Sequence, residues 1–200
     1  MPAEPLDDLM DDLRDAVERY VAAGFLSAEE IVECAIETVV EEDDDPRRLR
    51  PATVHLLERA LAAHARAQAT WPPVTDCDRL DEAFAELETR GIVARQDFSC
   101  CGTCGAAEIL EEMEGAAAAG VAVRGYVFYH AQDTESAVEG HGLCLSYGTG
   151  ADDEGGALAI GREIVAVLAR HGLAPAWDGR WGQRITLPLD WKRRRAEVGS

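Results

Sequence analysis

The sequence predicts an α+β protein in which a helical region, residues 1–90, precedes a sheet domain, residues 91–200. In the first part, apolar residues recur at steps of three and four, which is the spacing of an amphipathic helix. From Ile92 onward, short β-branched and aromatic segments alternate with helical stretches. Their order is β-α-β-β-α-β, the ferredoxin-like split βαβ pattern, with an added C-terminal hairpin strand.

Capping residues support the helices of the first region. Gly24 is placed to end the first helix, and Ser27 with Glu30 has the spacing of a capping box at the start of the second. The proline of Trp71-Pro72 is expected to end the third. The apolar stripes of the four predicted helices span residues 6–21, 31–40, 56–61 and 77–89.

Seven elements are predicted in the sheet domain. The Asp178-Gly179 dipeptide is typical of a tight hairpin turn between the last two strands, and Pro188 suits an edge strand because it cannot donate a hydrogen bond. The predicted elements, in order, are a strand at 92–98, a helix carrying 109–117, strands at 126–130 and 143–147, a helix at 158–171, and strands at 173–177 and 183–189.

Charge and hydropathy exclude some classes of partner. The formal net charge is −19, and residues 1–45 contain 16 acidic and 2 basic side chains. Such a surface repels phosphates, so we expect neither nucleic acid nor membrane as a partner. No apolar run is long enough to cross a bilayer, and the acidic N-terminus lacks a signal region, so the sequence predicts a cytoplasmic protein. The acidic helices could hold a basic partner protein, and the Lys192–Arg195 tail is expected to be a solvated C-terminus.

The predicted topology brings reactive side chains to one edge of the sheet. If the crossover between strands 92–98 and 126–130 is right-handed, these strands are parallel and end at the same rim. The strand at 143–147 returns antiparallel and begins at that rim. The side chains expected there are those of Cys100, Cys101, Cys104, His130, Asp133 and His141.

A zinc site is the first interpretation of this rim. The segment Cys101-Gly-Thr-Cys104-Gly has the C-x-x-C-G form of half a tetrahedral zinc site. The predicted ligands are Cys100, Cys101, Cys104, His130 and His141, with Asp133 or Cys144 as a further candidate. If the site is catalytic, a metal-bound water would be the nucleophile and Glu135 or Asp133 the general base.

Thiol chemistry and simple packing are the alternatives. A cysteine at a helix N-terminus has its thiolate stabilised, so Cys101 or Cys104 could be a nucleophile, with His130 as base and Asp133 orienting the imidazole. The C-x-x-C pair could instead cycle between dithiol and disulfide. Free cysteine is also a common buried residue, so the three cysteines could simply fill a tight turn. The sequence leaves open whether the protein is an enzyme.

Three motifs resemble those of a known family. The segments "RQDFSCCGTCGAAEI", "GYVFYHAQDTESA" and "GLCLSYG", in this order and spacing, resemble a bacterial family known as a domain of unknown function. The resemblance covers roughly residues 77–190, and the helical N-terminus more loosely. It implies no activity. It does imply that the shared motifs include Cys100, Cys101, Cys104, His130, Gln132, Asp133, Thr134 and Glu135.

Overall fold

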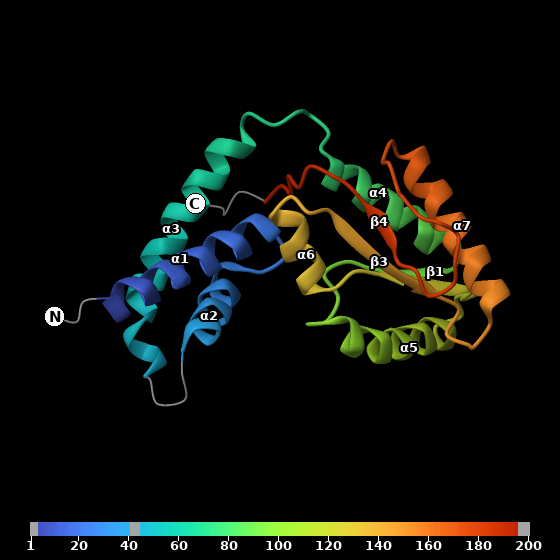
Figure 1. Cartoon of the computed structure of the whole chain (residues 1–200), viewed down its shortest axis with the longest axis horizontal. Coiled ribbons are helices and arrows are strands. Elements are labelled where there is room, and N and C mark those ends of the chain that lie inside the picture. Colours follow the sequence, from blue (N-terminus) through green and yellow to red (C-terminus); the bar gives the residue numbers. More distant parts are fainter. Residues whose placement is uncertain (1–3, 41–44, 196–200) are drawn as a thin grey trace. The chain divides into compact units, whose positions relative to one another are not determined.

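The computed structural model describes residues 4–40 and 45–195 and divides into two compact units. The helical unit comprises residues 1–72 and 192–200, and the sheet unit comprises residues 73–191. Figure 1 shows a mixed α and β architecture, so the predicted α+β class is confirmed. The predicted boundary lay after residue 90, whereas the units divide after residue 72, because helix α4 packs against β1 and α7 of the sheet unit.

Three α-helices and a short 3-10 helix form the described part of the helical unit. They are α1 (Glu4–Ala23), α2 (Ala28–Val39), η1 (Pro46–Arg48) and α3 (Arg50–Gln68). The predicted capping box is present at α2, where Ser27 accepts from the backbone N–H of Glu30 and the Glu30 carboxylate accepts from that of Ser27. The apolar stripes of the three helices meet in one core, which includes Leu13, Val17, Ile31, Ala35, Leu56 and Leu57.

The segment Lys192–Arg195 packs into the helical unit, so the expected solvated tail is wrong. The guanidinium of Arg195 donates to the carbonyls of Val21 and Leu26, around the turn between α1 and α2. Arg193 lies over the ring of Phe25, 4.1 Å from its centroid. Arg195 thus supplies donors to the carbonyl of Val21 in the last turn of α1 and to that of Leu26 in the turn that follows.

The sheet unit contains four helices and four strands in its described residues. In chain order they are α4 (Asp76–Thr89), β1 (Ile92–Arg95), α5 (Gly102–Ala118), β2 (Gly125–Phe128), α6 (Ala131–Val138), β3 (Leu143–Gly148), α7 (Glu154–Arg170) and β4 (Ile185–Leu187). The strand order is β1-β2-β3-β4, with β1 and β2 parallel and the other neighbours antiparallel. The predicted parallel crossover from β1 to β2 is therefore present.

The sheet does not have the ferredoxin-like arrangement that the sequence predicted. In a split βαβ unit another strand lies between the two parallel strands, whereas β1 and β2 here are direct neighbours. The short helix α6, absent from the prediction, separates β2 from β3. The strand expected at 173–177 is reduced to a single bridge between Ala176 and Thr186.

Helices cover both faces of the sheet. In Figure 1, α5 lies on one side, and α4 and α7 lie together on the other. The α5 side has a small core in which Ile109 packs with Val93 of β1 and Phe128 of β2. No described helix is long and apolar enough to cross a bilayer. The loop between β1 and α5 lies at the edge of the sheet where the parallel strands β1 and β2 both end.

Candidate functional site

The loop that carries the cysteines is fixed to the segment that follows β2. The backbone N–H of Phe98 donates to the carbonyl of Tyr129 (2.8 Å), and that of Ala131 donates to the carbonyl of Ser99 (3.1 Å). The two motifs singled out in the sequence are therefore joined by backbone hydrogen bonds at the ends of adjacent strands. This is the common rim that the predicted topology required.

The same loop has unusual backbone angles. Asp97 (φ 49°) and Ser99 (φ 66°) both adopt the left-handed conformation, which is uncommon outside glycine. The carboxylate of Asp97 accepts a 2.6 Å hydrogen bond from Thr134 Oγ1, which ties the turn to helix α6. Strained residues of this kind persist only where surrounding contacts hold them, and they concentrate at functional sites.

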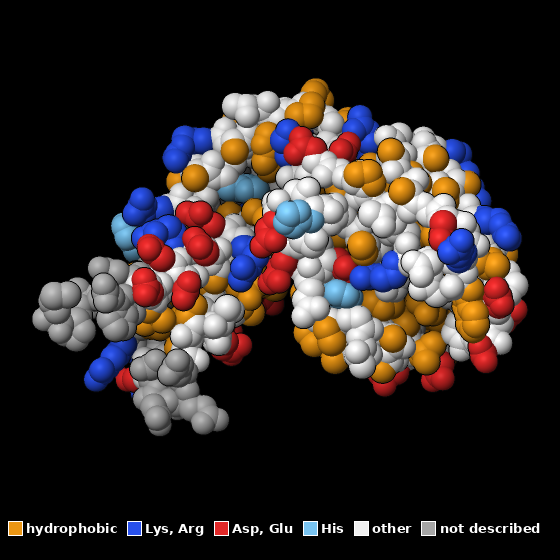
Figure 2. All heavy atoms as spheres, in the orientation of Figure 1, with side chains coloured by type: hydrophobic (Ala, Val, Ile, Leu, Met, Phe, Trp, Pro, Cys, Tyr) orange, Lys and Arg blue, Asp and Glu red, His pale blue; other side chains and the backbone are white. Residues whose placement is uncertain are grey.

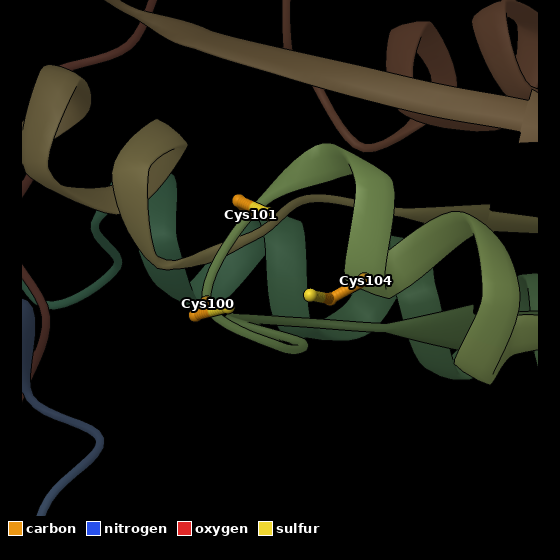
Figure 3. Close-up of side chains that lie close together, drawn as sticks. All are labelled: Cys100, Cys101 and Cys104. Atoms are coloured by element: carbon orange, nitrogen blue, oxygen red, sulfur yellow. The ribbon is translucent and has the colours of Figure 1, made fainter.

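The three cysteines lie close together where this loop enters α5. Cys101 is the N-cap residue of α5, Cys104 lies in its first turn, and Cys100 is exposed in the loop before it. Their sulfur atoms all lie within 4.8 Å of one another. Figure 3 shows the sulfurs of Cys100 and Cys104 pointing toward each other from the loop and the helix. Within the described residues they form the one group of this size that could hold a metal ion.

Gly102 and Gly105 allow the start of α5 to lie close to β2 and to His130. A Cβ at position 105 would lie 2.6 Å from Cε2 of Phe128, so a side chain there would push α5 away from β2. A Cβ at position 102 would lie 3.4 Å from Nε2 of His130. The glycines of the C-G-T-C-G segment therefore bring the start of α5 against the residues at the end of β2.

The thiols of the cluster differ in acidity. The backbone amides of Cys104 and Thr103 lower the pKa of the Cys101 thiol, because they stabilise a thiolate at the helix N-terminus. The neighbouring sulfurs of Cys100 and Cys101 raise the pKa of Cys104 to about 11. Cys101 therefore ionises before Cys104. The negative charge on the neighbouring sulfur then keeps the proton on Cys104.

His130 lies beside this cluster but is outside the group of three sulfurs. It is the N-cap residue of α6, its side chain is buried, and its ring lies against Gly102. Burial lowers the pKa of His130, while the nearby Asp133 carboxylate opposes that effect. The imidazole is therefore neutral near pH 7, which is the form that binds metals.

Asp133 is buried and belongs to an ionic network with His130 and the half-buried Arg184. Both of its carboxylate oxygens accept from the guanidinium of Arg184, and one of them lies 3.1 Å from Nε2 of His130. Arg184 also donates to the carbonyl of Cys144 on β3. Arg184 could not be predicted from the sequence, because it lies 51 residues from Asp133 and no local pattern connects them.

The remaining predicted residues lie elsewhere on this unit. His141 precedes β3 with its side chain 71% exposed, 3.8 Å from Glu139. Cys144 is half-buried on β3 opposite Thr186. Glu135 is half-buried on α6. His141 and Cys144 do not join the group of three sulfurs.

Comparison with known proteins identifies the family of this chain but no individual protein that matches it. The model of a family described as a domain of unknown function (DUF6891) matches residues 6–195. The chain therefore belongs to this family, which confirms the resemblance inferred from the motifs. No curated protein and no solved structure matches the sequence.

Proposed function

We propose that this member of the DUF6891 family binds a thiophilic metal ion, zinc in the first place, through Cys100, Cys101 and Cys104. The observation that carries the proposal is the mutual separation of the three sulfur atoms, all within 4.8 Å. A Zn–S bond of about 2.3 Å places sulfurs at the corners of a tetrahedron about 3.8 Å apart. Small rotations of the cysteine side chains would close the observed triangle to that size.

The electrostatics of the cluster favour a cation. Hydrogen bonds to the sulfurs of Cys100 and Cys101, and then repulsion between adjacent thiolates, raise the pKa of Cys104. A divalent ion removes this repulsion, so binding releases protons and becomes stronger as the pH rises. Thiolate ligands also select zinc over hard ions such as magnesium and calcium. The fourth position is left to His130, to His141 or to water.

The first test is metal content, measured on reduced full-length protein purified without chelator. We expect about one zinc per chain in the wild type and in the control Cys34→Ser, whose cysteine lies on α2 of the helical unit. Cys101→Ser and Cys104→Ser should lose the metal. Thiol titration should show about three protected sulfhydryls until a chelator is added. Metal-free wild type that also fails to take up added zinc would overturn the proposal.

Thiol–disulfide exchange is the second candidate, supported by the opposed acidities of Cys101 and Cys104. In this reaction the Cys101 thiolate attacks an external disulfide and expels one thiolate. The Cys104 sulfur, after losing its proton to solvent, then attacks the mixed disulfide and expels the second thiolate. The products are a Cys101–Cys104 disulfide and two reduced thiols. Oxidised glutathione added to metal-free Cys104→Ser should then give a stable mixed disulfide at Cys101, visible by mass spectrometry.

A further inference from the structure

The triangle of sulfurs supplies three ligands, whereas a zinc ion in a protein takes four. Among the described residues, the group that could hold a metal ion consists of Cys100, Cys101 and Cys104 and includes no further His, Cys, Asp or Glu. The fourth position is therefore filled either by a side chain that moves toward the ion or by a small molecule from solution. The surroundings of the predicted histidine ligands favour the second possibility.

His130 lies beside the cluster, but its ring is held by Asp133. The ring edge that faces Gly102 consists of Nε2 and Cδ2, which lie 3.4 and 3.6 Å from the position of a Cβ there. Nε2 also lies 3.1 Å from Oδ2 of Asp133, and both oxygens of that carboxylate accept from Arg184. Ligation through Nε2 would take the imidazole away from a carboxylate that is only 7% exposed, which costs free energy. Nδ1 is buried and is not among the ring atoms within 4 Å of that Cβ position.

His141 and Cys144 are also kept away from the sulfurs. The cluster lies beside the N-cap of α6, whereas His141 follows the opposite end of this helix, whose eight residues extend about 12 Å. The His141 side chain is 71% exposed and lies beside Glu139. Cys144 lies on β3, where it is paired with Thr186 of β4. Neither residue belongs to the group of three sulfurs.

The cysteine cluster is accessible from solution. Cys100 is exposed, and Cys101 and Cys104 are half-buried. Structural zinc sites are closed by four protein ligands, whereas zinc sites with three protein ligands keep a position for water or substrate. An accessible cluster with three ligands has the composition of the second kind of site.

We propose that the fourth coordination position of the metal site is open to solvent and takes a small thiol as an exchangeable ligand. This inference rests on the proposed function. Three thiolates exceed the charge of a divalent ion, so the site attracts hard oxygen ligands weakly, whereas it retains the preference of zinc for soft sulfur. Cys101 is the N-cap residue of α5, so the positive end of the helix dipole stabilises additional negative charge there.

Binding of the thiol is a ligand exchange. A thiol that coordinates zinc loses its proton, so it binds as the thiolate. The proton passes to solvent, and one water molecule leaves the ion. The exchange changes no oxidation state and therefore requires neither an oxidant nor a reductant.

The test uses the reduced full-length chain loaded with equimolar Co²⁺, whose sulfur-to-metal charge-transfer absorption reports the number of thiolate ligands. A phosphine serves as the reductant, so that no thiol is present at the start. Addition of 2-mercaptoethanol should raise this absorption per cobalt by about one third, as three thiolates become four, and release about one proton per site. Ethylene glycol, which has a hydroxyl group in place of the thiol, should leave the spectrum unchanged.

Two variants separate a ligand from solution and a ligand from the protein. Cys34→Ser should give the wild-type titration, because Cys34 lies on α2 of the helical unit. Without added thiol, the cobalt bands of His130→Ala should coincide with those of the wild type. A shift of the bands in this variant would show that the imidazole is a ligand and would overturn the open position. If His130→Ala does not fold, the thiol titration of the wild type still decides the question.

Failure of this inference differs from failure of the proposed function. Wild type that binds neither cobalt nor zinc overturns the proposed metal site and the open position together. Cobalt-loaded wild type whose spectrum does not respond to 2-mercaptoethanol, or whose cobalt the thiol removes, leaves the three-cysteine site standing and overturns the open position alone.

Discussion

The helical unit and the sheet unit each have a half-buried cysteine on a helix, yet the two thiols lie in opposite surroundings. Cys34 lies in the middle of α2, where burial raises its pKa and Glu37, Glu30 and Glu33 add to that effect. Cys101 lies at the N-cap of α5, where backbone amides lower its pKa. Burial and nearby carboxylates at one cysteine, and helix N-terminal amides at the other, therefore move the two thiol pKa values in opposite directions.

The two units also differ in how they use polar groups. Apart from Thr53, the buried core of the helical unit is apolar, and its acidic side chains gather on the surface over α1 in Figure 2. The sheet unit buries His130, Asp133 and Thr134 close to the cysteine loop. Buried polar groups are costly unless each has a partner, so this concentration supports placing the proposed site on the sheet unit. Four measurements test this difference between the two units.

The largest effect is expected for Arg195, the half-buried cation of the helical unit. Arg195→Ala removes the donors for the carbonyls of Val21 and Leu26 and should lower the free energy of unfolding by about 3 kcal/mol. Urea denaturation followed by far-ultraviolet circular dichroism measures this loss. Arg66→Ala, an exposed position on α3, should change stability by less than about 0.5 kcal/mol. Equal effects of the two substitutions would show that the C-terminal segment is not an integral part of this unit.

The next effect contrasts two glycines of α5 in the sheet unit. Gly105→Ala places a methyl group 2.6 Å from Cε2 of Phe128 and should destabilise the protein by about 2 kcal/mol. Gly115→Ala meets no atom within 4 Å and should stabilise it by about 0.5–1 kcal/mol, because alanine loses less conformational entropy in a helix. Thermal denaturation of both variants gives the comparison. A stabilising Gly105→Ala would mean that α5 does not pack as closely on β2 as the structure indicates.

The third effect tests the two thiols directly. In metal-free protein at pH 7, Cys101 should react with iodoacetamide at least about tenfold faster than Cys34, because a larger fraction of it is thiolate. Timed alkylation followed by peptide mass spectrometry resolves the two sites. Cys101→Ser should abolish the fast phase and leave the rate at Cys34 unchanged. Similar rates at the two cysteines would remove the electrostatic contrast between the units.

The smallest effect concerns surface charge on the sheet unit. His171, Arg170 and Arg90 lower the pKa of Glu86 from 4.5 to about 2. Because this folded-state pKa lies below the ordinary value, the stabilisation is complete above pH 4.5 and is lost as the pH falls toward 2. The melting temperature of Glu86→Gln should therefore be below that of the wild type at pH 7, and the gap should narrow on acidification. Glu29→Gln, which breaks the exposed pair with Arg50 on the helical unit, should show little change at either pH. A gap for Glu86→Gln that is constant with pH would contradict the assigned cause.

The local structure and much of the rim could be predicted from the amino-acid sequence alone. Helical periodicity and the Ser27–Glu30 capping box predicted the helices of the first region, because these signals act over three or four residues. The parallel crossover from β1 to β2 followed from the general handedness of such connections. Because that crossover places two strand ends together, the proximity of the cysteine loop and His130 could be predicted without coordinates.

Tertiary structure decided the strand order, the partners of the buried charges and the place of the C-terminal segment. Helix α6 is only eight residues long, and the sequence predicts a strand that ends at His130, which is the N-cap residue of this helix. The pairing of Asp133 with Arg184 joins residues 51 positions apart. The docking of Arg195 on carbonyls near residues 21–26 spans most of the chain. Contacts of this kind leave no periodic trace in a sequence, because they depend on which surfaces meet once the elements have formed.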